Sequence, residues 1–264
     1  MFMNNNIFIH ADDYGYSENI SRDILSCIDD GIVNSVSVMV YGNQEYYQKI
    51  KNRNLKNISL HLNLTSLNLN EEHKNSKILN NLSFTKLFFA NKKLKEICKA
   101  ELRKQILIFK DEFGYDDFNA DGHHHIQIIP WIFDFLSNKE LIIQLRIPNE
   151  KVKFFSIKIF YNITFWRNLL AVNILKILTL WKSNNRYKNF AGLLYSGIYN
   201  NKIFLKHLKS LKKSDLPFEI TFHPGSGTES EKEIFKHSHF KYVTSKNRRT
   251  EFNLLKSINL DDVF

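Results

Sequence analysis

Segments with the pattern of buried strands alternate along the chain with segments that have helical spacing, and this alternation restricts the fold more than any other feature. The runs NIFIHADD (6–13), SVSVMV (35–40) and FEITFHPG (218–225) are short, apolar and β-branched, as is typical of strands. Between them, SENISRDILSCIDDG (17–31) and KKLKEICKAELRKQILIFKDEFG (92–114) have the periodicity and end signals of helices. Such alternation favours an α/β fold with a parallel sheet or barrel.

Length and cysteine content bound the organisation of the chain. The 264 residues are enough for one large α/β domain, and 9 Gly and 4 Pro leave little room for flexible linkers. Cys27 and Cys98 lie far apart and match no metal-binding spacing. Buried, reduced thiols are therefore expected. The first residues, MFMNNNIFIHADD, lack the pattern of a signal peptide, and we expect a cytoplasmic protein.

The formal charge of +10 allows three interpretations: a nucleic-acid partner, an anionic membrane or substrate, or a plain surface bias. The Lys residues are scattered, and no dense basic block with stacking aromatics is visible. Surface bias is therefore favoured, and no nucleic-acid partner is expected.

Residues 154–181 form the most apolar stretch of the chain. Lys158, Arg167 and Lys176 interrupt it, so no uncharged span long enough for a transmembrane helix exists. Apolar residues recur at helical spacing between Phe165 and Trp181. A helix packed on its own domain is favoured, and contact with a lipid surface or a partner chain is the alternative.

Ionisable residues occur where the expected strands end. These residues, with one neighbouring amide, are Asp12, Asp13, His61, Asn63, Asp121, His123, Arg146 and His223. In parallel sheets and barrels, the loops after the strands gather at one edge, where the chemistry takes place. Burying such groups costs free energy unless a partner or a metal compensates. The pattern therefore indicates a functional site at that edge.

The stretch DGHHHIQ (121–127) adds a second signal. If it is a strand, Asp121, His123, His125 and Gln127 share one face, and His124 lies on the other. Together with His61 and the two adjacent acids at 12–13, this set predicts a metal site. Two imidazoles and a carboxylate suit Zn²⁺ and similar ions and leave positions open for water and substrate, as in catalytic sites.

The segments HADDYGYSENIS, SVSVMV, ISLHLNLT, ADGHHHIQIIP, LRIPNE and EITFHPG, in this order, resemble the YdjC-like carbohydrate deacetylases. The resemblance implies a distorted (β/α) TIM-like barrel that forms a single domain over residues 1–264. A divergent, mostly helical insertion around 151–215 matches poorly. The resemblance also implies one divalent metal ion, Mg²⁺ or Zn²⁺, and a homodimer.

The resemblance also implies roles for individual residues. Carried over by position, Asp13, His61 and His123 are expected to be the metal ligands, Asp12 the general base and His223 the general acid. The residues expected to organise the site or contact substrate are Arg146, His125, Gln127 and Asn63. Many family members have His where this chain has Gln127, so we expect altered substrate contacts with the metal retained.

The expected reaction is hydrolysis of an N-acetyl group from an amino sugar or glycan, with Asp12 taking a proton from a metal-activated water. Two alternatives remain: a metal-dependent phosphoesterase or other hydrolase on the same barrel, and a non-catalytic glycan-binding relative. Neither the acetylated sugar nor the metal can be chosen from the residues alone.

Overall fold

The computed structural model describes residues 6–180, 189–211 and 217–258 and contains a seven-stranded, wholly parallel sheet. Its order is β5-β4-β3-β2-β1-β7-β6. The strands are β1 (Ile7–Tyr14), β2 (Ser35–Val38), β3 (Asn57–Leu62), β4 (Phe118–Gly122), β5 (Ile142–Leu145), β6 (Asn189–Ala191) and β7 (Phe218–Phe222). The α/β prediction is confirmed.

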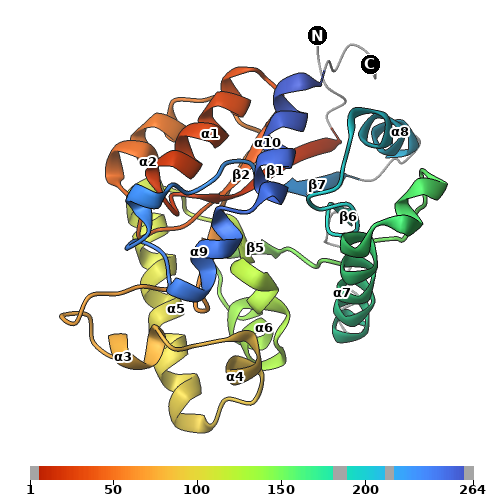
Figure 1. The fold of residues 1–264 in the computed structure, drawn as a ribbon. Coiled ribbons are helices and arrows are strands. Elements are labelled where there is room, and N and C mark those ends of the chain that lie inside the picture. The colour runs from red at the N-terminus through yellow and green to blue at the C-terminus, as the bar shows by residue number, and fades with distance from the viewer. Residues whose placement is uncertain (1–5, 181–188, 212–216, 259–264) are drawn as a thin grey trace.

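Helices surround the curled sheet, with α1, α2 and α10 on one side and α5 and α6 on another (Figure 1). The α-helices are α1 (Glu18–Asp29), α2 (Gln44–Lys51), α3 (Ser76–Leu79), α4 (Phe84–Phe88), α5 (Lys92–Phe113), α6 (Pro130–Ser137), α7 (Ile163–Thr179), α8 (Asn201–Leu211), α9 (His237–Val243) and α10 (Lys246–Ser257). Three 3₁₀ turns are η1 (His123–Ile128), η2 (Ile157–Tyr161) and η3 (Glu229–Glu231). No helix among the described residues is long and apolar enough to cross a membrane.

Local signals account for the helix ends. The Ser17 hydroxyl accepts a hydrogen bond from the Ile20 N–H and caps α1. Gly114 ends α5 at φ +67°, a left-handed conformation in which glycine has no steric penalty. The two long helices expected at 17–31 and 92–114 are therefore confirmed.

The sheet is curled, but strand pairing does not close it into a TIM-like barrel. Its two edges are β5 and β6. These edge strands are separated by a gap. Among the described residues, one isolated parallel bridge, between Glu150 and Phe190, spans it. The observed architecture is thus an open, half-barrel α/β fold, and barrel closure is not confirmed.

The two faces of the sheet differ in chemistry. Ile9, Val36, Leu60 and Ile220 are fully buried, and they belong to the apolar core that includes the surrounding helices. The alternate positions on the inner face carry polar side chains, each at most 4% exposed: His10, Ser35, Ser37, Ser59, His61, Asp121 and Thr221. Period-two alternation therefore separates an outer packing face from a polar interior.

The strand considered over residues 121–127 ends at Gly122, so this part of the prediction is wrong. His124 and His125 adopt φ values of +54° and +56°, and the chain turns through η1. The expected alternation of Asp121, His123, His125 and Gln127 on one strand face therefore does not exist. Non-glycine residues at positive φ are uncommon and concentrate at functional sites.

The segment from 151 onward contains η2, α7 and α8, and it also supplies β6 to the sheet. The helix expected between Phe165 and Trp181 is confirmed over its described part as α7. Cys27 and Cys98 are both buried free thiols, as expected.

Candidate functional site

Asp12 and Asp13 are neighbours in sequence, yet both carboxylates reach the same end of the sheet. Consecutive residues of a regular strand point to opposite faces. Here Asp13 has φ +73°, and the pairing of β1 with β2 shifts register between Ala11 and Tyr14. This local distortion turns the Asp13 side chain into the site beside Asp12.

Asp13, His61 and His123 form one buried group, with ligand atoms within 4.8 Å of one another. Asp13 Oδ1 lies 3.3 Å from His61 Nε2 and 3.0 Å from His123 Nδ1. Nε2 of His61 and Nε2 of His123 are buried, and neither has a hydrogen-bond partner within the part of the chain that the structure describes. Buried polar atoms normally have a hydrogen-bond partner, so these two nitrogens are candidates to bind a ligand. The donor set fits a divalent ion.

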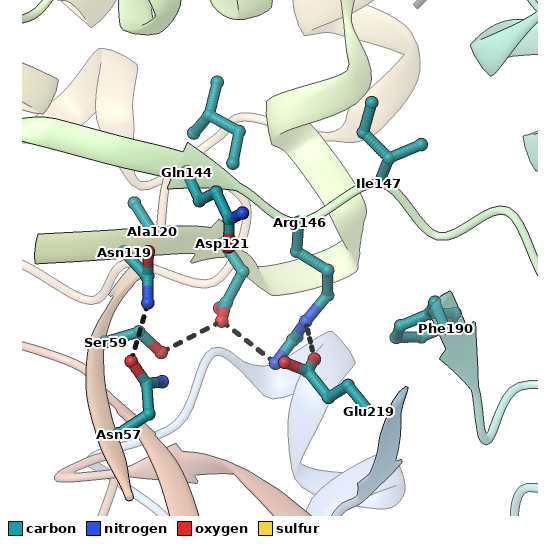
Figure 2. Close-up of a pocket in the computed structure, with 11 residues that line it drawn as sticks. Asn57, Ser59, Asn119, Ala120, Asp121, Gln144, Arg146, Ile147, Phe190 and Glu219 are labelled. Carbon is teal, nitrogen blue, oxygen red and sulfur yellow. Dashed lines mark hydrogen bonds and ion pairs between the residues drawn. The ribbon is translucent and has the colours of Figure 1, made fainter. Parts of the chain in front are cut away.

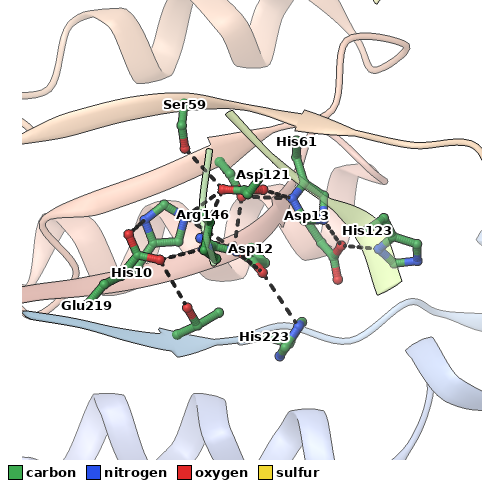
Figure 3. Close-up of polar contacts among 12 residues, drawn as sticks. His10, Asp12, Asp13, Ser59, His61, Asp121, His123, Arg146, Glu219 and His223 are labelled. Carbon is green, nitrogen blue, oxygen red and sulfur yellow. Dashed lines mark hydrogen bonds and ion pairs between the residues drawn. The ribbon is translucent and has the colours of Figure 1, made fainter. Parts of the chain in front are cut away.

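One ring nitrogen of His61 is bonded to a carboxylate, which is the arrangement common for metal-binding histidines. Its Nδ1 contacts the Asp121 carboxylate and lies 3.1 Å from the Ser37 hydroxyl, so its Nε2 faces Asp13 (Figure 3). Burial lowers the pKa of His61, but the charges of Asp121 and Asp12 outweigh it and raise the pKa to about 10. Metal binding would therefore have to displace a proton from this ring.

Arg248 holds the other oxygen of Asp13. Its Nη1 lies 2.6 Å from Asp13 Oδ2, and its Nε donates to the Gly225 carbonyl at 2.7 Å. Burial raises the pKa of Asp13, but His123 and Arg248 outweigh it and hold the pKa well below its usual range. Asp13 is thus a fixed carboxylate whose Oδ1 faces both histidines.

Asp12 belongs to a different group, built around Arg146. The guanidinium donates to both oxygens of Asp12, at 2.9 Å and 3.0 Å, and contacts Asp121 and Glu219 (Figure 3). The Ser37 hydroxyl donates to Asp12 Oδ1 at 2.9 Å. Burial raises the pKa of Asp12, but the Arg146 charge and His61 outweigh it and leave the pKa well below its usual range.

A small cavity of about 30 Å³ lies inside the curled sheet beside Arg146 (Figure 2). Ser59, Asp121, Glu219 and Phe190 also line it. Because it adjoins the gap between β5 and β6, it follows from the incomplete closure of the sheet. A space of this size holds about one water molecule.

His223 follows β7 and faces the Asp12 carboxylate, with 3.8 Å between its Nε2 and Asp12 Oδ2. On its other side, Nδ1 lies 3.7 Å from Glu251 Oε2. Glu251 also accepts from Ser196 and Gly197, which fixes its position. Burial lowers the pKa of His223, but Glu251 and the two aspartates outweigh it and raise the pKa.

The four residues expected to organise the site or contact substrate lie in different places. Arg146 is in the centre of the carboxylate group, as described above. His125 is half-buried, and burial together with the Arg146 charge lowers its pKa to about 3. Gln127 is fully buried and donates to the Arg146 carbonyl at 3.0 Å. Asn63 is buried, and its side-chain oxygen accepts from Ser66.

A larger cavity of about 100 Å³ opens beside His61. Tyr16, Tyr41, Asn63 and Gln105 line it together with His61. Tyrosine rings and amides next to a candidate metal centre are the mixture expected of a small polar ligand's pocket. Asn63 therefore lies at the wall of a cavity that reaches the candidate metal ligands.

Several residues of the site were not among those predicted from the sequence. Arg248 and Glu251 come from α10, where no local pattern distinguishes them from surface charges. His239 of α9 lies 3.0 Å from His124, Nε2 to Nε2, and His124 also contacts the Thr65 hydroxyl at 2.9 Å. His124, expected on the strand face opposite His123, thus belongs to a second histidine group with His123 and His239.

The chain is similar to known proteins in sequence and in fold. A family model described as "YdjC-like protein" matches residues 6–264. A carbohydrate deacetylase of Danio rerio is 28% identical over 134 residues, which are 47% of this chain and 42% of that protein. The matched part therefore spans less than half the length of that relative.

One solved structure has the same fold. It is that of a putative cellobiose-phosphate cleavage protein from Enterococcus faecalis V583, with a TM-score of 0.61 and 18% sequence identity. The alignment covers 97% of this chain and 92% of that one. At this identity, the likeness is one of fold.

Proposed function

The chain belongs to the family of YdjC-like proteins, and on that premise we propose that it is a metal-dependent carbohydrate deacetylase. The observation that carries the proposal is that two acids at the carboxyl end of β1, Asp12 and Asp13, belong to separate groups of side chains. Asp13 faces two histidines whose Nε2 atoms lack a hydrogen-bond partner among the described residues, whereas Arg146 holds Asp12 apart from them. A metal-assisted hydrolase needs both a carboxylate that binds the metal and a general base that does not.

Asp13, His61 and His123 would hold the metal ion. When bound, a divalent ion in such a site polarises a carbonyl oxygen and lowers the pKa of water. The two imidazoles favour Zn²⁺, and Mg²⁺ could bind at the same site by completing its shell with water.

Asp12 would act as the general base. Its lowered pKa keeps the carboxylate ionised at neutral pH, and the two Arg146 bonds fix its orientation. It would take a proton from water as the water oxygen bonds to the acetyl carbon. Arg146 is then a positioning residue, since it acts on the reaction through Asp12.

His223 would act as the general acid. Its raised pKa favours the imidazolium, and Glu251 stabilises that charge from the Nδ1 side. It would give its proton to the nitrogen as the C–N bond breaks, leaving acetate and a free amino sugar. The 3.8 Å between His223 Nε2 and Asp12 Oδ2 would let the proton taken by Asp12 return to His223.

The cavity beside His61 would receive the acetamide group or the sugar ring that carries it. Asn63 lies on its wall, and Tyr16 and Tyr41 offer aromatic surface to a sugar. Gln127 is fully buried and bonded to the Arg146 backbone, so its influence on substrate would be exerted through Arg146.

The test is a panel of N-acetylated sugars and sugar phosphates, incubated with protein that has been stripped of metal and reloaded with Zn²⁺, Mg²⁺, Mn²⁺ or Co²⁺. We expect acetate release that requires the metal and disappears in His61→Ala. Asp134→Asn, at an exposed position on α6, is the surface control and should retain the rate. Phosphate release without acetate would instead identify a phosphoesterase, and binding without turnover a glycan-binding protein.

A further inference from the structure

Helix α7 carries apolar side chains on two faces, and only one of them packs on the protein. Phe165, Val172 and Leu175 are buried. A second stripe is exposed, with these exposed fractions: Ile163 81%, Trp166 49%, Leu170 62%, Ile174 48% and Ile177 66%. The spacing of three or four residues keeps these five side chains on one face of the helix. An ordinary surface helix has a polar outer face.

The apolar surface continues into η2. Ile157 is 80% exposed and Tyr161 is 90% exposed. Among the described residues, 10 of the 17 large apolar side chains that are exposed lie between Phe154 and Leu180. Figure 1 shows α7 at the margin of the fold, beside β6 and far from α1 and α2. Contiguous exposed apolar surface of this kind marks a site of contact with a membrane or a partner.

Basic side chains border this apolar surface. A groove of about 630 Å³ is lined by Phe154, Ile157 and Phe160 and by three lysines: Lys158, Lys202 and Lys206. All three lysines are exposed. An ammonium group beside exposed aromatic and aliphatic carbon suits an anionic headgroup above an acyl chain.

The net charge of the chain originates in this region. Residues 151–214 contain 13 Lys and Arg and no Asp or Glu, whereas the other 200 residues contain 24 Lys and Arg and 27 Asp and Glu. The positive charge is therefore not a general surface bias, which corrects the interpretation favoured from composition. It is concentrated in the same segment as the exposed apolar stripe.

We propose that the surface formed by η2 and α7 docks onto an anionic lipid bilayer. The stripe would lie in the headgroup region with its apolar face toward the acyl chains, and Trp166 and Tyr161 would occupy the interface that aromatic residues prefer. The surrounding lysines would face lipid phosphates. A second copy of the chain fits less well, because it would bring an equally basic segment against the first.

The test is flotation of the full chain with phosphatidylcholine vesicles, either pure or containing about one-third phosphatidylglycerol. Leu170→Glu/Ile174→Glu places two charges on the stripe. The matched control is Leu107→Glu/Ile143→Glu, at positions that are each 54% exposed elsewhere on the surface. Circular dichroism confirms that both variants fold.

We expect the wild type to bind the anionic vesicles at least about tenfold more tightly than the pure ones, and to lose that preference at high salt. The stripe variant should lose at least about tenfold in binding, since it buries two charges, and the control should stay within about twofold. Lys158→Gln/Lys202→Gln/Lys206→Gln should weaken binding to the anionic vesicles alone.

Three results would overturn the proposal. They are a wild type that floats with neither vesicle, a control that loses as much binding as the stripe variant, and a wild-type dimer that the stripe substitutions dissociate without any effect on flotation. The last result would assign the surface to a second copy of the chain. The assay measures binding alone, so it is independent of the proposed reaction.

Discussion

Replacement of Arg146 by glutamine tests whether the polar interior depends on this one cation. Arg146 contacts Asp12 at 2.9 Å, Asp121 at 3.0 Å and Glu219 at 2.5 Å. Its side chain is 6% exposed, and the three carboxylates are 9% exposed or less. Removing one partner of a buried ion pair leaves an uncompensated charge and costs about 3–5 kcal/mol. We expect Arg146→Gln to lower the free energy of unfolding by about this amount near neutral pH.

The pH dependence of this stability loss is a second, independent measure of the pairing between Arg146 and Asp12. In the wild type, the pKa of Asp12 is depressed, so its stabilising contribution is present above the unfolded pKa and disappears as pH falls through the folded one. Burial is the largest influence on the pKa of Asp12, so we expect removal of Arg146 to let the pKa rise above its unfolded value. The folded variant would then bind a proton that the unfolded chain does not. Its stability then falls as pH rises. The difference between wild type and variant should therefore be smaller near pH ~5 than near pH ~8.

Urea unfolding followed by circular dichroism at both pH values measures the effect. The control is Arg53→Gln, because Arg53 pairs with Asp29 on the surface at 3.1 Å, with exposed fractions of 29% and 55%. An exposed pair contributes about 0–1 kcal/mol. A loss in Arg146→Gln no larger than in Arg53→Gln, or one that is equal at both pH values, would show that the three carboxylates do not depend on Arg146.

Three further predictions concern the candidate ligand, the candidate acid and a buried carboxylate. His123→Ala should bind Zn²⁺ with an affinity at least about tenfold lower than that of the wild type, as measured by calorimetry, because it removes one ligand of the Asp13 group. An unchanged affinity would exclude His123 as a ligand. Glu251→Gln should lower the pKa of His223, so the alkaline limb of the pH–rate profile should move to lower pH; an unmoved limb would contradict the role of His223. Burial raises the pKa of Glu150 to about 7, so its ionisation costs stability as pH rises. Glu150→Gln should gain about 1–3 kcal/mol relative to wild type between pH ~5 and pH ~8 by urea unfolding, and a constant difference would contradict this.

The sequence was sufficient where local pattern and fold agree. The long α5 follows from apolar periodicity and from Gly114, and the end of β7 follows from the apolar run that stops at His223. The run that stops at Asp12 locates β1, although that strand continues to Tyr14. Because parallel strands end at one edge, the residues after them could be expected to meet. The structure brings Asp13, His61 and His123 together, and their roles remain a proposal.

The sequence was insufficient where the backbone departs from a regular element. Asp13, His124 and His125 adopt positive φ values, which a period-two pattern does not contain. Period-two reasoning therefore assigned His124 and His125 to strand faces that do not exist. Arg248 and Glu251 reach the site from a C-terminal helix, and nothing in SKNRRTEF separates these buried charges from exposed ones. Closure of the sheet depends on pairing between its edges, for which single-strand patterns contain no information.

The proposed reaction is tested most directly by comparing wild type with Asp12→Asn and measuring bound metal, acetate and free amine from one N-acetylated sugar in the same samples. We expect equimolar acetate and amine from the wild type, and an Asp12→Asn protein that binds the same amount of metal but releases neither product. Asp12→Asn protein with the wild-type rate would contradict the assignment of the base. Wild-type protein that holds metal but yields no acetate from any acetylated sugar would contradict the proposed reaction itself.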